Sequence, residues 1–120
     1  KLNGEEHETT LSAANNYAVS LNGLQRFEET KALLRKTMPV ARRVLGELHR
    51  LALKMRWLYA GALCEDEGAT LADLREAVNT LDETERTARR VFGGAHPLAA
   101  AIKEELRFAR PALSARETPP

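Results

Sequence analysis

At 120 residues the chain is long enough for one compact domain and too short for two of ordinary size. Apolar residues make up 43% of it but aromatic residues only 5%, which favours closely packed helices over strands. A formal net charge of +1 gives the chain no strong positive field that would attract polyanions, so we expect neither nucleic acid nor an anionic membrane as a partner. The only cysteine, Cys64, excludes an internal disulfide framework and favours a cytoplasmic location.

A short motif occurs twice in the chain. ARRVLG at residues 41–46 recurs as ARRVFG at residues 88–93, and a histidine follows each copy after three residues, at His49 and His96. The segment GEEH at residues 4–7 resembles the same junction. Junction glycines therefore lie 42 and then 47 residues apart, at Gly4, Gly46 and Gly93. Periods of this length are typical of helical repeat proteins.

The first period divides into two helical stretches. Apolar residues spaced by three and four predict a helix over residues 8–22, which Asn22 and Gly23 end. A second helix is predicted over residues 27–45, with Gly46 as its C-terminal cap. Pro39 lies inside this second helix, where its ring collides with a carbonyl one turn earlier, so we expect a kink.

The second period repeats this pattern, and a third begins. Helices are predicted over residues 50–64 and from Thr70 to residue 92, with Thr70 and Asp73 capping the latter reciprocally. Pro97 is well placed in the first turn of a last helix over residues 97–109. Residues 1–110 are therefore expected to form the repeat domain and residues 111–120 a flexible tail.

A series of small signals in the first period matches a known repeat. In chain order these are the spaced glycine and histidine, Leu11, Asn15-Asn16-Tyr17-Ala18, Leu21, Arg26-Phe27-Glu28-Glu29 and Val44-Leu45-Gly46. This succession resembles the tetratricopeptide repeat of kinesin light chain and nephrocystin-3-like proteins. The resemblance implies an all-α, right-handed α-solenoid of antiparallel helix hairpins, about two and a half repeats long. The chain departs from the family at Gln25, where the family usually has glycine.

The resemblance also implies a function and a site. Proteins of this family are non-catalytic scaffolds that bind a peptide or helical segment of a partner protein in a concave groove lined by the first helix of each hairpin. Asparagines on that helix bind the peptide main chain, and Asn15 and Asn16 match them. With the neighbouring positions on the same face, the predicted groove residues are Ser12, Asn15, Asn16, Val19, Asn22, Lys54, Trp57 and Glu104. In the alternative interpretation, Asn16 faces water and Trp57 fills the core.

Two rival sites have less support from the sequence. His7, His49 and His96 recur one per repeat, which separates them far beyond metal-ligand distance, so we expect each to bond the adjoining turn. Cys64 with His49 lacks the third group of a nucleophilic triad. No metal, cofactor or enzymatic activity is therefore expected.

Two further alternatives concern macromolecular contacts. Six basic residues could bind nucleic acid, but nearby glutamates make a solvated outer face the better interpretation; the basic residues are Arg35, Lys36, Arg42, Arg43, Arg89 and Arg90. We expect the chain to be an excerpt of a larger repeat array. The last helix of the chain then lacks the second helix of its own hairpin, which would cover its apolar side. The chain would then be a structural segment without its own groove, or two copies would meet through Leu98, Ile102 and Leu106.

Overall fold

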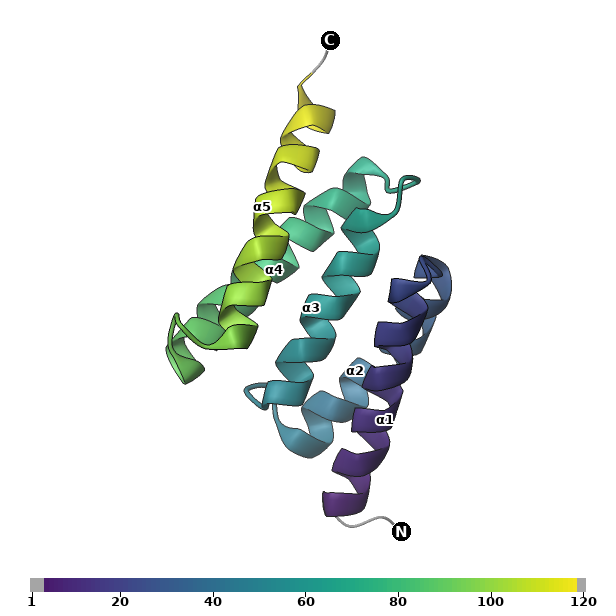
Figure 1. The fold of residues 1–120 in the computed structure, drawn as a ribbon, viewed down its shortest axis with the longest axis vertical. Coiled ribbons are helices and arrows are strands. Elements are labelled where there is room, and N and C mark those ends of the chain that lie inside the picture. The colour runs from purple at the N-terminus through teal and green to yellow at the C-terminus, as the bar shows by residue number, and fades with distance from the viewer. Residues whose placement is uncertain (1–3, 119–120) are drawn as a thin grey trace.

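The computed structural model describes residues 4–118 of the chain, and the side chains of residues 7–118. Five α-helices follow one another, and no strand occurs among the described residues (Figure 1). They are α1 (Gly4–Gly23), α2 (Phe27–Leu45), α3 (Arg50–Glu65), α4 (Leu71–Phe92) and α5 (Pro97–Glu117). The predicted all-α fold is confirmed, and the predicted ends of α2 and start of α3 agree with the structure to the residue.

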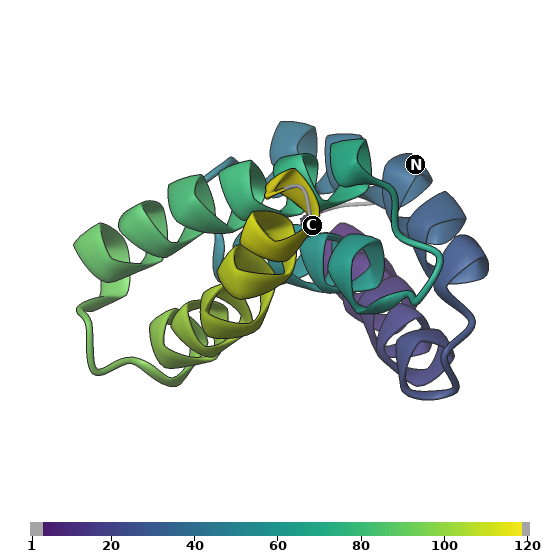
Figure 2. The same ribbon diagram turned by 90° about the horizontal axis from the view of Figure 1, so that it is seen from above.

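The helices form two layers. Each helix packs against the next, and α3 additionally contacts α1 and α5. Between residues 4 and 118, no Cα atom of α2 lies within 8 Å of one in α4. Viewed from above, α1, α3 and α5 lie along one side, and α2 and α4 along the other (Figure 2). The molecule is elongated, with principal extents of 55 × 31 × 20 Å.

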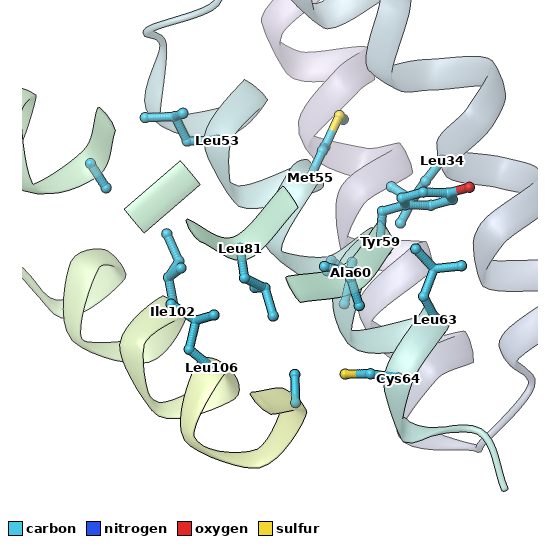
Figure 3. Packing of buried hydrophobic residues seen from close by; sticks show 14 of the residues in the cluster. Leu34, Leu53, Met55, Tyr59, Ala60, Leu63, Cys64, Leu81, Ile102 and Leu106 are labelled. Atoms are coloured by element: carbon cyan, nitrogen blue, oxygen red, sulfur yellow. The ribbon is translucent and has the colours of Figure 1, made fainter. Parts of the chain in front are cut away.

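The layers are joined by a continuous apolar core (Figure 3). Every helix contributes to it, and the largest fully buried apolar side chains are Leu34, Leu53, Met55, Leu63, Leu81 and Ile102. Each buried leucine contributes about 1.5 to 3 kcal/mol relative to an exposed position. The hairpins therefore stabilise one another through shared burial, as stacked repeats do.

The helix starts are capped by side chains from the repeated junctions. His49 Nδ1 accepts a hydrogen bond from the Leu51 amide at 3.0 Å, and His96 Nδ1 accepts one from the Leu98 amide at 3.1 Å. The predicted bond to the adjoining turn is thus confirmed for these two histidines. Thr70 and Asp73 form the predicted reciprocal cap of α4. The Thr70 backbone amide, which donates to the Asp73 carboxylate at 2.9 Å, is the main cause of that carboxyl's lowered pKa.

Backbone conformation marks the turns. Gly46 and Gly93 follow the two helices that end each full hairpin, with φ of 98° and 93°. The turn between α1 and α2 instead has Gln25 at φ 61°, a left-handed conformation that L side chains disfavour. This is the position where the resembled family usually has glycine, so the sequence departure creates local strain.

The predicted tail from residue 111 requires correction. α5 continues through Pro111 to Glu117, because its last turns are held to the turn before α4. Arg116 Nη1 donates to the Ala69 carbonyl at 2.8 Å, and Glu117 pairs with Arg75 at 3.2 Å. Residues 119–120 of the predicted tail lie outside the described residues. α2 is likewise continuous through Pro39, and the kink expected there stays a prediction.

The alternative in which two copies meet through an interface on the last helix is also wrong. Leu98, Ile102 and Leu106 are only 7%, 0% and 2% exposed, since α5 packs against both α4 and α3. The preceding hairpin thus covers the apolar side of α5 within one chain. These three residues are unavailable for contact with a second copy.

Gln25→Gly is expected to stabilise the fold. A left-handed non-glycine residue costs about 1 to 2 kcal/mol, and glycine gives back about 0.5 to 1 kcal/mol through greater flexibility of the unfolded chain. The net gain should be about 0.5 to 1 kcal/mol in urea unfolding. Leu24→Gly, in the same exposed turn but without positive φ, is the matched control. A loss of stability in Gln25→Gly would contradict the strain.

Candidate functional site

A hollow of about 470 Å³ lies where α1 and α3 run side by side. We call it the central hollow, and its lining residues are Asn16, Val19, Asn22, Gly23, Lys54, Trp57, Leu58, Gly61, Glu65 and Glu105. Five of the eight predicted groove residues are therefore brought together here, from two helices. The walls are apolar along Val19, Trp57 and Leu58, and charged at Lys54 and at the two glutamates.

Two neighbouring hollows extend the central one along α3 and α5. One, of about 270 Å³, is lined by Arg50, Lys54, Trp57, His96, Pro97, Leu98 and Ala101. The other, of about 520 Å³, is lined by Trp57, Glu65, Ala101, Glu104, Glu105 and Phe108. Trp57 lines all three hollows, so they adjoin at its indole ring. We call the three hollows together the groove.

The two asparagines that match the family motif occupy different environments. Asn16 is exposed and lines both the central hollow and a further hollow of about 620 Å³ along α1, which contains Ser12. Asn15 is 1% exposed and lines none of these hollows, so its predicted place in the groove is corrected. The reason is helical spacing, because Asn15 lies four residues after Leu11 and three before Ala18, both of which are buried.

Trp57 is both a groove residue and a core residue, which the sequence analysis treated as alternatives. It packs against the core and is half-buried, yet one side of the ring borders the groove. Its indole Nε1 is buried and has no hydrogen-bond partner among the described residues. Asn22 Oδ1, another atom at the central hollow, is also buried and unpaired there. Unpaired buried polar atoms are uncommon and costly, and Asn15 Oδ1, which lies outside these hollows, is a third one among the described residues.

A pair of carboxyl groups was missed by the sequence reasoning. Glu65 of α3 and Glu105 of α5 bring their carboxyl groups together beside Gly61, and Cys64 Sγ donates to Glu105 Oε2 at 3.6 Å. The Glu65 carboxyl turns over Gly61, where an added Cβ would lie 3.1 Å from Glu65 Oε2. Trp57, Gly61 and Glu65 follow one another at a spacing of four residues and so share one face of α3. This spacing is the signal that could have added Glu65 to the predicted groove.

The environment of this pair changes its protonation. Burial of the carboxyl end, followed by the hydrogen bond with Glu105, raises the pKa of Glu65 to about 7. Burial, followed by the nearby Glu105 charge, also raises the pKa of the Cys64 thiol. A thiol of raised pKa is a poor nucleophile. It also lies about 20 Å along α3 from His49, judged from the helical rise, so the two do not form a catalytic pair.

The two charged residues predicted for the groove lie at different depths. Lys54 is half-buried and borders two of the hollows. Glu104 is exposed and pairs with Arg107 at 3.2 Å, while its neighbour Glu105 turns inward. The groove is therefore basic toward the start of α3 and acidic toward its end. Within residues 7–118, no three metal-ligating side chains converge.

Residues 10–51 match the family model of the tetratricopeptide repeat. The matched segment covers most of α1, all of α2 and the start of α3. With five helices and the internal repeat of the junctions, it supports an all-α, tetratricopeptide-like helical repeat fold. No curated protein and no solved structure matches the chain. Tetratricopeptide repeats generally mediate contacts between proteins. No helix in the described part of the chain is long and apolar enough to span a membrane.

The raised pKa of Glu65 predicts a pH-dependent stability. Since the folded-state pKa is about 7 against 4.5 for the free side chain, the protonated form is favoured by folding. Its contribution is complete below pH 4.5 and is lost as the pH rises to about 7. The residue as a whole is exposed, so solvent screening limits the effect to about 1 kcal/mol.

Glu65→Gln, which keeps a neutral hydrogen-bonding group, is expected to remove this loss. The variant should be about 1 kcal/mol more stable than the original chain at pH 8, and equal to it at pH 4. Urea unfolding across this pH range measures the difference. Glu67→Gln, an exposed change in the same turn, is the control and should leave the pH profile unchanged. An unchanged profile in Glu65→Gln would show that this carboxyl has an ordinary pKa.

Proposed function

We propose that the chain is a non-catalytic scaffold that binds a short segment of a partner protein in the groove between α1, α3 and α5. The observation that carries this proposal is the position of Trp57, a large half-buried ring that borders three adjoining hollows. Tryptophan at the centre of a surface hollow is a frequent anchor of binding energy. The tetratricopeptide match at residues 10–51 supports the same class of function.

Polar atoms along the groove suit the main chain of a peptide. Trp57 Nε1 is a donor without an acceptor, and Asn22 Oδ1 an acceptor without a donor, among the described residues. A peptide backbone offers both a carbonyl and an amide, whatever its sequence. The exposed Asn16 amide adds one further donor and acceptor. Main-chain recognition by the exposed Asn16 amide would fix the ligand in place and leave its side chains to determine selectivity.

The charges of the groove suggest a direction for the ligand. Lys54 and Glu65 are separated by about 16 Å along α3, from the helical rise. An extended peptide crosses that distance in about five residues. The ligand that fits best therefore has an acidic side chain near Lys54, an apolar one on Trp57 and a basic one near Glu65 and Glu105.

Trp57→Ala is expected to weaken peptide binding by about 30-fold, because truncating a central anchor costs about 2 kcal/mol. Seven-residue peptides would first be selected from a random library by the wild-type chain, and their affinity measured by fluorescence polarisation. Asn16→Ala, which changes an exposed residue, should reduce affinity without affecting the fold. Val91→Ala, an exposed apolar change on α4, serves as the control.

The result also decides between the scaffold and the alternative of a structural segment without its own groove. Failure to select any peptide would favour the structural segment. Peptides that bind all the variants equally would place the ligand elsewhere on the chain. Circular dichroism of Trp57→Ala is needed beside the binding data, since the ring also contacts the core.

A further inference from the structure

Four arginines converge on a second hollow, which shares no lining residue with the groove. We call it the arginine hollow; its volume is about 470 Å³ and its lining residues are Arg42, Glu47, Arg56, Glu83, Arg86, Thr87 and Arg90. Its lining residues come from the end of α2, the turn that follows, α3 and α4. α2 and α4 lie in the same layer (Figure 2). Arg56 of α3 also lines it, with its side chain 20% exposed.

The spacing of the sequence explains this convergence. Glu83, Arg86, Thr87 and Arg90 lie three and four residues apart and so share one face of α4. Arg42 comes from the last turn of α2, within the motif that the second repeat duplicates. Residues distant in the sequence therefore form one basic surface, although the overall charge of the chain is close to neutral.

The charges in the arginine hollow are incompletely neutralised. Four arginines against two glutamates leave a formal charge of +2. The ion pair to Arg56 is long, with 3.8 Å between Arg56 Nη2 and Glu83 Oε2. Arg42, Arg86 and Arg90 form no ion pair with other described residues. Like charges held close together repel one another, and a bound anion would relieve this repulsion.

We propose that the arginine hollow binds a phosphate monoester. Near neutral pH such a group carries a charge of about −1.5 to −2, which matches the excess charge of the hollow. Its three terminal oxygens can accept hydrogen bonds from several guanidinium groups at once, and arginine presents paired donors in the geometry that phosphate requires. A carboxylate has two oxygens and one charge, so it would use the four arginines less completely.

The test compares two double variants that remove the same charge from the same two helices. Arg42→Gln with Arg90→Gln changes the hollow, whereas Arg43→Gln with Arg89→Gln changes exposed residues of the same duplicated motif that do not line it. O-phosphoserine and inorganic phosphate would be titrated into the intact chain in buffer with 150 mM salt. The Nε–H signal of Arg56 in a nitrogen-15 correlation spectrum reports occupation of the hollow.

O-phosphoserine is expected to shift the Arg56 signal, and the hollow variant to bind it at least tenfold more weakly than the control variant. Tighter binding of O-phosphoserine than of inorganic phosphate would identify an ester as the ligand, and the reverse order a free phosphate ion. An equal loss of affinity in both double variants would overturn the proposal, because it would show that phosphate responds only to the overall charge of the protein. Equal affinity for a dinucleotide, whose phosphodiester has a single charge, would indicate nucleic acid instead. Absence of any shift at millimolar O-phosphoserine would also overturn it.

Discussion

The structure depends on the burial of α3 by all four other helices. Eleven of its sixteen residues are buried, so α3 must be apolar or small on nearly every side. Ala52, Ala60, Gly61 and Ala62 provide the small side chains that permit such close approach. The few polar positions left on α3 are confined to the gaps between its neighbours. Lys54 and Trp57 border the groove, and Arg56 reaches the arginine hollow, so one helix supplies residues to both surfaces.

Local signals in the sequence were sufficient to predict the helices. The caps at Thr70, His49 and His96 and the junction glycines Gly46 and Gly93 are local features, because each bond joins residues within four positions of one another. The continuation of α5 could not be predicted in that way. It depends on Arg116 reaching the Ala69 carbonyl, 47 residues earlier in the chain, and a proline at position 111 argues locally for the opposite result.

The candidate site was predictable in its location but less so in its detail. The resemblance to the tetratricopeptide repeat assigned both Asn15 and Asn16 to the groove, but adjacent residues point about 100° apart on a helix, and packing buries Asn15 while Asn16 stays exposed. The carboxyl pair of Glu65 and Glu105 was beyond sequence reasoning for a different reason. Its two members come from different repeats, and only the packing of α5 against α3 brings them together.

The longer second repeat and the longer last helix belong together structurally. Five additional residues separate the second and third junctions, and α4 has 22 residues where α2 has 19. α5 has 21 residues, and Glu117 in its final turn pairs with Arg75 near the start of α4. A shorter α4 would leave the end of α5 without these partners. The additional residues of the second repeat therefore provide the surface against which α5 continues past Pro111. The irregular repeat length is thus explained by the packing of α5.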